Sequence, residues 1–308
     1  MKIGAIVRLG EDERPGETPR CPSFQEIRGV AERMENGGFD SIWLFDHLLY
    51  REPGEPASGL WECWTMLSAL AAVTHRVEIG ALVLCAHFRN PALLAKMATT
   101  LDEVSNGRLI LGLGAGWNKA EFEAFGIPYD HRIERFEEAL RIVVPLLEGK
   151  KTDFGGRFHQ ARDCELLPHG PRPGGPPILI GAFGPRMIEL AVRYGSMWNG
   201  GYCGTMDTFA GLLHRFEAAR DSAGETPGDI EASALVKVGW PDLAEIPAFF
   251  EGEYVAGSAE DMAAAFHDFE RAGVAHVMCQ YHPNTSEALT RLLAALQAYR
   301  RLVATAVS

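Results

Sequence analysis

Two adjacent residues, Asp46 and His47, have the clearest capacity for chemistry, and they follow the apolar run Phe39–Phe45. Histidine titrates near neutrality and can donate or accept a proton. A neighbouring carboxylate can orient such a ring or bind a polar group of a cofactor. A polar pair that hydrogen-bonds its own loop is the alternative. Because the pair directly follows an apolar run, the sequence favours a functional role for both residues.

A glycine-rich segment, Gly112–Trp117 (GLGAGW), is similar to a dinucleotide-binding fingerprint but departs from it. The third glycine of the fingerprint would fall at Trp117, and no acidic ribose-binding residue stands in the place that a Rossmann order requires. The small residues Gly114, Ala115 and Gly116 would let a flat ligand approach the backbone, with Trp117 closing one wall. A tight turn after a strand is the alternative interpretation.

A second small-residue segment joins a predicted strand to a predicted helix and contains Gly181, Ala182, Phe183 and Gly184. Pro185 then stands at the expected first turn of the helix, with Arg186 beside it. Exposed N–H groups at a helix start attract anions, so the segment predicts a phosphate site without a lysine-rich patch. A plain strand-to-helix turn is the alternative.

Other catalytic and metal-binding patterns are missing from the sequence. The ten histidines show no H-x-x-x-H spacing, so no metal site is predicted, and neither a G-x-S-x-G elbow nor a P-loop occurs. The six cysteines are scattered without a C-x-x-C pair, which indicates reduced thiols and a cytoplasmic protein.

The composition limits the class of protein and its partners. The 308 residues are 47% hydrophobic, which is typical of a globular chain, and the formal net charge is −12. Nucleic acids and anionic membranes need a basic surface, so neither is an expected partner. No apolar run approaches the roughly 20 residues that span a bilayer. The length fits one large domain or two small ones, and a barrel of about 250 residues with insertions is the one-domain option, which would cover residues 1–308. A small-molecule substrate is expected.

Strands and helices are expected to alternate along the whole chain. The strands are near-continuous apolar runs, as in a parallel sheet that helices cover on the outside. The predicted strands are Lys2–Arg8, Phe39–Phe45, Val77–Cys85, Arg108–Leu113, Pro177–Gly181, Ser196–Asn199, Ile230–Val238 and Val274–Gln280. The predicted helices are Ser23–Asn36, Trp61–Val73, Pro91–Val104, Arg132–Leu147, Pro185–Tyr194, Asp207–Ala223, Ala259–Ala272 and Ser286–Leu302.

This alternation favours an α/β fold, a closed (β/α)8 TIM barrel with insertions at its C-terminal face. Leu48–Gly59 and Gly239–Gly257 follow strands and therefore belong to that face, where the second is a candidate lid. Lys150–Pro176 follows a helix and contains a predicted hairpin. Residues just past the strand ends point into the site of such a barrel. They are Arg8, Asp46, His47, Leu82–Asn90, Gly114–Asn118, Gly181–Arg186, Asn199 and Gln280–His282.

Several linked motifs together resemble the bacterial-luciferase-like superfamily. They are WLFDH, ECWTMLSALAAVTHRVEIGALVL, FRNPALLAKMATTLDEVSNGRLILGLGAGW, RIERFEEAL and ILIGAFGPRMIELAVRYGSMWNG. The resemblance runs over most of the chain. It implies a (β/α)8 barrel that uses reduced FMN or the deazaflavin coenzyme F420 for monooxygenation or hydride transfer.

The resemblance also implies roles for individual residues. Asp46 and His47 match the pair that faces the cofactor ring. Leu82 and Val83 match the position of a non-proline cis peptide bond behind that ring. Gly114, Ala115, Gly116 and Trp117 match one wall, and Gly181, Ala182, Phe183, Gly184 and Arg186 match the loop that binds the cofactor phosphate.

Two departures limit what the resemblance implies about the substrate. F420-using sugar-phosphate dehydrogenases carry glutamate where this chain has Trp117, and tryptophan shortly after the histidine where it has Leu48–Tyr50. Their substrate and acid catalyst are therefore not transferred. The G-A-G-W segment is similar to oxidoreductases assigned to F420, which favours F420 over FMN. The alternatives are a non-catalytic flavin-binding protein and a metal-dependent barrel hydrolase. A homodimer through Met66–Val73 and Leu93–Leu101 is also expected.

Overall fold

The computed structural model describes two compact units of this chain. It covers residues 1–11, 20–51, 56–224, 229–250 and 253–306, so the two predicted insertions after strands lie partly outside the described residues. Unit 1 combines Met1–Val7, Val30–Trp43 and Gly181–Ser308. Unit 2 combines Arg8–Gly29 and Leu44–Ile180. Each unit is described separately below.

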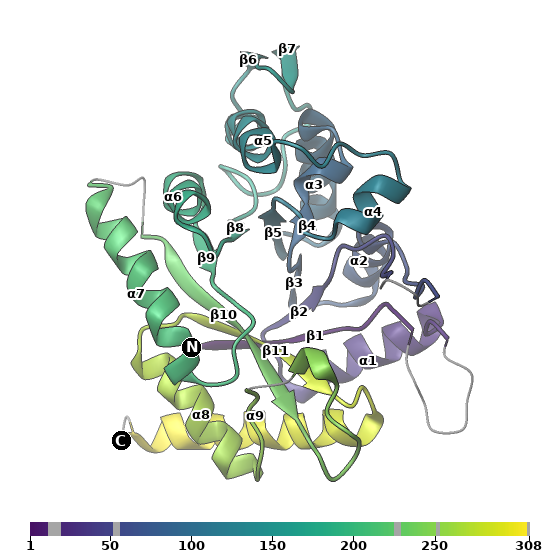
Figure 1. Ribbon diagram of the computed structural model, residues 1–308, viewed down its shortest axis with the longest axis vertical. Helices are drawn as coiled ribbons and strands as arrows, with labels where there is room; N and C mark the ends of the chain where they lie inside the picture. The colour runs from purple at the N-terminus through teal and green to yellow at the C-terminus, as the bar shows by residue number, and fades with distance from the viewer. Residues whose placement is uncertain (12–19, 52–55, 225–228, 251–252, 307–308) are drawn as a thin grey trace. The chain divides into compact units, whose positions relative to one another are not determined.

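Unit 1 is built on a parallel sheet with the strand order β2-β1-β11-β10-β9 (Figure 1). Nearly every residue of these strands is buried, which confirms the prediction from their apolar sequences. Their bounds are Lys2–Ile6 for β1, Ser41–Leu44 for β2, Met197–Asn199 for β9, Glu231–Gly239 for β10 and His276–His282 for β11.

The helices of unit 1 cover this sheet. They are α6 (Pro185–Tyr194), α7 (Met206–Ser222), α8 (Ala259–Arg271), α9 (Ser286–Ala306) and the second half of α1 (Phe24–Gly37), with the 3-10 turn η2 at Ala248–Phe250. Helices α8 and α9 pack against each other (Figure 1). Trp198 of β9 stacks on Phe216 of α7, with ring centroids 4.3 Å apart and planes 6° from parallel. This aromatic contact joins strand to helix in the core.

A buried polar triad lies within the sheet of unit 1. Trp43 Nε1 donates to Ser41 Oγ at 2.7 Å, and Ser41 Oγ lies 2.7 Å from His276 Nε2. A side chain at Gly4 would place its Cβ 2.0 Å from Ser41 Oγ, so only glycine leaves room for the triad. Burial lowers the pKa of His276 to about 3, which makes it a neutral core histidine.

Unit 2 contains a second set of parallel strands, in which β5 pairs with β3, β4 and β8. Their bounds are Glu78–Ala81 for β3, Leu84–Cys85 for β4, Leu109–Gly114 for β5 and Ile178–Gly181 for β8. The helices are α2 (Cys63–Val73), α3 (Pro91–Val104), α4 (Lys119–Ala124) and α5 (Arg132–Leu147), with the 3-10 turn η1 at Ala86–Phe88. Pro91 begins α3 behind the Asn90 cap, as its sequence predicts.

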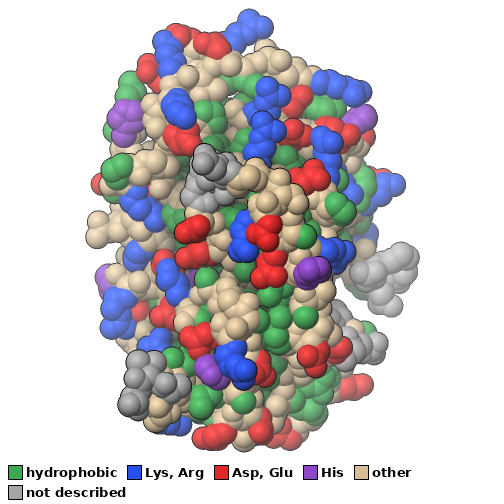
Figure 2. All heavy atoms as spheres, turned by 90° about the vertical axis from the view of Figure 1, so that its left-hand side faces the viewer, with side chains coloured by type: hydrophobic (Ala, Val, Ile, Leu, Met, Phe, Trp, Pro, Cys, Tyr) green, Lys and Arg blue, Asp and Glu red, His purple; other side chains and the backbone are tan. Residues whose placement is uncertain are grey.

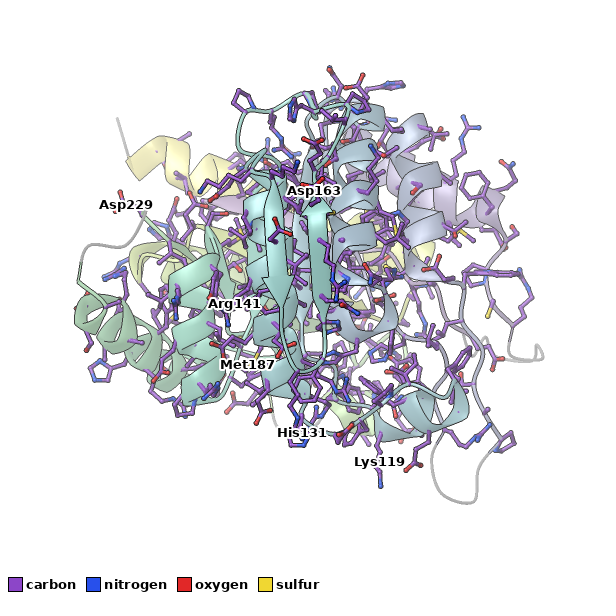
Figure 3. The ribbon with its side chains drawn as sticks, turned by 90° about the horizontal axis from the view of Figure 1, so that it is seen from above. Lys119, His131, Arg141, Asp163, Met187 and Asp229 are labelled. Atoms are coloured by element: carbon purple, nitrogen blue, oxygen red, sulfur yellow. The ribbon has the colours of Figure 1, made fainter. Side chains whose placement is uncertain are left out.

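A short hairpin lies along α5, formed by β6 (Thr152–Gly155) and β7 (Gln160–Cys164). Figure 3 shows it from above, with Asp163 labelled on β7 and Arg141 on the neighbouring helix. The Arg141 guanidinium lies 4.8 Å from the ring centroid of Phe154. The DFGGRFHQ segment is therefore confirmed as a hairpin that packs on a helix.

The main difference from the predicted elements is in the third strand. Val77–Cys85 was expected to be continuous, but it divides into β3 and β4 at the cis peptide bond between Leu82 and Val83. The cis bond itself was expected from the family resemblance. The short helix α4 was not predicted, because Lys119–Ala124 is too short to show a helical repeat.

The surface carries both signs of charge. On the face that Figure 2 shows, acidic and basic side chains are interspersed over the described residues. Within the described part of the chain, no helix is long and apolar enough to cross a membrane.

Candidate functional site

The carboxyl end of β2 leads directly to His47, whose ring is held by three neighbouring groups of unit 2. Tyr50 lies at a centroid distance of 4.6 Å, and Trp117 meets the ring edge-on at 5.5 Å and 75°. The Nδ1 atom lies 3.1 Å and 3.2 Å from the two carboxylate oxygens of Glu121. The histidine is thus oriented by contacts on its faces and at one nitrogen.

Glu121 fixes the protonation pattern of this histidine. Because a carboxylate only accepts hydrogen bonds, Nδ1 of His47 carries the proton in this contact, and in the neutral ring Nε2 is left as the acceptor. Glu121 also accepts from the backbone N–H of Leu48 at 2.9 Å, and its side chain is 2% exposed. The carboxylate therefore binds the ring and the backbone that follows it, and both contacts hold His47 in one orientation.

Asp46 has a different set of partners from its neighbour His47. Its carboxylate accepts from both terminal nitrogens of Arg89, at 2.7 Å and 3.1 Å, and from Cys85 N–H at 2.9 Å. Arg89 reaches on to Glu62, the N-cap residue of α2, at 2.6 Å. Burial raises the pKa of Asp46, and the Arg89 guanidinium opposes that shift. Asp46 therefore ties the end of β2 to β4 and to the segment that follows it.

The backbone at Leu82–Val83 is fitted closely against β5. Leu82 N–H donates to the Leu44 carbonyl at 2.7 Å. A Cβ at Gly112 would lie 1.9 Å from the Ala81 carbonyl oxygen, and one at Gly114 would lie 2.5 Å from Val83 Cγ2. These two glycines make room for the neighbouring strand, a different reason from the ligand approach suggested by the sequence. Val83 itself is half-buried.

The segment after β5 exposes an aromatic side chain. Gly116 has a φ of +68°, and a Cβ there would lie 2.7 Å from both Cys85 Sγ and Phe122, so glycine is required. Trp117 follows with 65% of its surface exposed. Asn118 then donates to the Leu49 carbonyl at 3.0 Å. The backbone of Gly114–Trp117 is thus fixed at both ends, while the indole stays open beside His47.

The predicted phosphate loop lies in unit 1 and is described by itself. Ala182 N–H donates to the Asn199 carbonyl at 3.0 Å, and Trp198 Nε1 donates to the Ala182 carbonyl at 2.9 Å. Gly184 is the N-cap of α6 and supplies no side-chain cap, and Pro185 begins the helix. Phe183, Gly184 and Arg186 are exposed. The loop therefore presents the first N–H groups of a ten-residue helix without a side-chain cap.

The remaining strand-end residues make local contacts. Asn199 is buried, with Nδ2 3.1 Å from Ser233 Oγ and Oδ1 accepting from Gly201 N–H at 3.2 Å. His282 Nε2 lies 2.9 Å from the Glu245 carbonyl, and Arg8 donates to the Glu11 carbonyl. These contacts stabilise loops within each unit.

Sequence reasoning missed the two residues that complete the unit 2 centre, Glu121 and Arg89. Arg89 lay inside the Leu82–Asn90 stretch but was not singled out. Glu121 was missed because α4 was not predicted. The sequence feature that could have indicated Glu121 is its position four residues after Trp117, about one helical turn beyond the loop.

Metal binding receives no support in the described parts of the chain. They contain no group of three or more His, Cys, Asp or Glu side chains that could hold a metal ion. All six cysteines are described and are free thiols.

Comparison with known proteins identifies the family. The model of the luciferase-like monooxygenase family matches residues 1–245. The chain is 34% identical to the 5,10-methylenetetrahydromethanopterin reductase of Archaeoglobus fulgidus, over 56% of this chain and 48% of that protein. It is 30% identical to the F420-dependent glucose-6-phosphate dehydrogenase of Kineococcus radiotolerans, over 70% of this chain and 64% of that protein. The chain thus matches about half to two thirds of the length of these relatives.

A solved structure extends the likeness to nearly the whole chain. The F420-dependent secondary alcohol dehydrogenase in complex with an F420-acetone adduct has a TM-score of 0.79 and 21% identity, over 97% of this chain and 99% of that one. At this identity the likeness shows the fold, which is a (β/α)8 barrel as predicted. The residues matched by the family model include both the His47 centre and the loop before α6, and the chain belongs to the luciferase-like monooxygenase family.

Proposed function

We propose that the protein is an oxidoreductase that uses the deazaflavin coenzyme F420 to transfer hydride to or from a small organic substrate. The observation that carries this proposal is the His47–Glu121 pair at the carboxyl end of β2. Reduction of a carbonyl, or oxidation of an alcohol, needs a proton carrier as well as a hydride carrier. A histidine with one nitrogen fixed and the other available meets that need.

Taken separately, the residues of each unit fit one part of a flat cofactor with an anionic tail. In unit 2, Leu82, Val83 and the segment Gly114–Trp117 would hold the ring, and the open indole of Trp117 offers an apolar face. In unit 1, the uncapped start of α6 with Gly181–Arg186 would hold the phosphate, because main-chain N–H groups at a helix start attract anions. Asp46 would act indirectly, by fixing the backbone next to the cofactor ring through its bonds to Cys85 and Arg89.

The residues of the chain divide the chemical work. The cofactor, when bound, supplies or accepts the hydride. His47 moves the proton at Nε2, while Glu121 holds Nδ1 and stabilises the positive charge that the ring carries when it is doubly protonated. Trp117 and Tyr50 limit the positions of the ring and exclude water from one side of it.

Reduced FMN and monooxygenation form the second candidate, which the description of the matched family favours. In that case the bound flavin would supply the oxygen-transfer chemistry, and the residues around His47 would exclude water from its ring. A non-catalytic flavin-binding protein and a metal-dependent hydrolase are rivals from other classes. Turnover of any aldehyde, ketone, alcohol or imine excludes the first, and elemental analysis of the purified protein tests the second.

Further features of the proposal concern assembly and location. A cytoplasmic homodimer with residues 1–308 as one domain is proposed, and nucleic acids and membranes are not proposed as partners. Helix α3 supports a dimer contact, since Leu93 is 55% and Val104 is 49% exposed. Analytical ultracentrifugation of the wild type and of Leu93→Glu would test the contact, because a charge in a buried interface should give monomers.

The deciding experiment is titration of the purified protein with F420 and FMN, each in its oxidised and reduced form. We expect F420 to bind with a Kd below about 100 μM and FMN to bind more weakly. His47→Ala should keep that affinity and lower turnover at least tenfold, about 1.4 kcal/mol of barrier. The exposed His131→Ala is the matched control and should be unchanged. If neither cofactor binds, the proposal is wrong in both forms.

A further inference from the structure

A lysine is buried within the sheet of unit 1. Lys237 lies in β10, two residues before the strand ends, and only 6% of it is exposed. It interrupts the apolar sequence ALVKVG. Its partner in the parallel register is Gln280 of β11, so the two residues are neighbours at the carboxyl end of this strand pair. Residues in that position of a (β/α)8 barrel face the functional end.

The ammonium group of Lys237 has few partners. Nζ lies 3.4 Å from the Phe250 carbonyl oxygen, a long hydrogen bond, and 5.3 Å from the ring centroid of Tyr202. Among the described residues, no carboxylate forms an ion pair with it. An ammonium has three donors, and one long hydrogen bond with one ring contact replaces little of the solvation lost on burial.

The neighbouring groups that the structure describes do not balance the charge of Lys237. Burial raises the pKa of the Cys203 thiol to about 12, so this thiol is neutral at pH 7. Glu253 is exposed and influences the thiol electrostatically. The Gln280 Oε1 atom is buried and has no hydrogen-bond partner. A buried cation and a half-buried amide thus stand side by side. The Gln280 side chain interacts with the Tyr202 hydroxyl, while its Oε1 atom and the Lys237 ammonium keep unused hydrogen-bonding capacity.

The main chain holds Lys237 in this position. Its N–H donates to the Cys203 carbonyl at 2.8 Å, and its carbonyl accepts from Val255 N–H at 2.8 Å. Tyr202, next to Cys203, adopts a φ of +73°, which is uncommon for a residue with a side chain. These bonds on one edge of β10, and the pairing with β11 on the other, fix the backbone from which the Lys237 side chain enters the buried region.

We propose that Lys237 and Gln280 form a binding subsite for an oxyanion, a carboxylate or phosphate group carried by the substrate. Lys237 Nζ would donate to the anion. Rotation of the Gln280 amide by a half-turn exchanges its nitrogen and oxygen and would add a second donor. That the anion belongs to the substrate rests on the proposed function, whereas the subsite itself does not.

The test begins with cofactor-free protein and two probes, inorganic phosphate and acetate, with acetamide as the neutral match for acetate. We expect both anions to bind the wild type and acetamide not to bind. Lys237→Met keeps the length of the side chain and removes the charge, so it should weaken anion binding at least tenfold. Lys150→Met, a control at an exposed lysine, should bind like the wild type. Equal anion binding by Lys237→Met and wild type would overturn the subsite.

Two further measurements guard against misfolding and assign the anion. Without added anion, Lys237→Met should unfold at the same or a higher temperature than the wild type. Added phosphate should raise the unfolding temperature of the wild type and leave that of Lys237→Met unchanged. Gln280→Leu, as a second variant, should weaken phosphate binding about three- to tenfold. Saturating cofactor should leave phosphate affinity unchanged. If the cofactor and phosphate compete, the subsite binds an anionic group of the cofactor, and the assignment to the substrate is overturned. If no cofactor binds, the proposed function fails while the phosphate titration still decides the subsite.

Discussion

Arg89 in unit 2 and Lys237 in unit 1 are both basic side chains withdrawn from water near strand ends, but they are compensated very differently. Arg89 forms hydrogen bonds with two carboxylates, those of Asp46 and Glu62, at 2.6–3.1 Å. Lys237 has one carbonyl contact at 3.4 Å. Among the described residues, the charge of Arg89 is thus compensated by carboxylates and that of Lys237 is not.

This difference in charge compensation indicates a structural role for Arg89 and a ligand-binding role for Lys237. A basic group whose charge is compensated by carboxylates holds its backbone rigidly but has little capacity left for an anionic ligand. An incomplete network costs stability in the free protein and regains that free energy when a ligand completes it. We therefore assign Arg89 and Asp46 to positioning and Lys237 to recognition.

Substitution of Arg89 should give the largest effect. Arg89→Met leaves the Asp46 carboxylate buried without its cation, so we expect a loss of about 3–5 kcal/mol in the free energy of unfolding at pH 8. The loss should shrink as pH falls, because burial raises the pKa of Asp46 and protonation removes the unpaired charge. Urea denaturation at pH 8 and pH 5 measures both values.

Lys237→Met is the matched control for that experiment, since it removes the other buried basic group. Its free energy of unfolding should stay the same or increase, because no carboxylate in the described segments loses a counter-charge when Lys237 is replaced. Equal losses in the two variants would show that the contrast between the networks does not exist.

A buried group of a third kind, the neutral His276, should give the next largest effect. Its pKa is lowered to about 3 in the folded protein, against about 6.5 when unfolded, so the unfolded chain binds more protons between these values. Its contribution to stability is complete above pH 6.5 and falls by about 1.4 kcal/mol per pH unit below it.

The contribution of His276 is measured as a difference between two proteins. His276→Gln keeps a polar side chain beside Ser41 and cannot titrate. Between pH 6 and pH 4.5 the unfolding free energy of the wild type should fall more steeply than that of the variant, by about 1.4 kcal/mol per pH unit. Parallel curves would contradict a neutral buried histidine.

The smallest effect concerns the positioning role of Glu121. Glu121→Gln removes its negative charge but keeps the size of the side chain, so kcat should fall about three- to tenfold with little change in KM. Ring-nitrogen NMR of His47 should show a proton on Nδ1 in the wild type and a mixture of tautomers in the variant. Glu123→Gln, on the exposed side of the same helix, should change neither.

The alternation of strands and helices could be predicted from the sequence, because buried parallel strands are continuous apolar runs. The helix Arg132–Leu147 and the start of α3 at Pro91 were predicted at the residues where the structure has them. The family resemblance placed the cis peptide at Leu82–Val83. The role of Asp46 and His47 in binding a cofactor stays a prediction.

The partners of these residues could not be predicted, since pairing depends on contacts between distant positions. His47 and Glu121 are 74 residues apart, and Asp46 and Arg89 are 43 apart. Adjacency in the sequence suggested that Asp46 would orient His47, but alternate positions on an extended chain point to opposite sides. Lys237 was passed over because a single charge in an apolar run gives no periodic signal.

The close fit between Gly114 and Val83 means that these two positions are mechanically coupled. A methyl group added at position 114 would require a smaller residue at position 83, and neither change alone preserves the local shape. A protein engineer who wishes to reshape this wall should therefore mutate both codons together. In a library, we expect tolerated variants to appear as compensating small–large pairs.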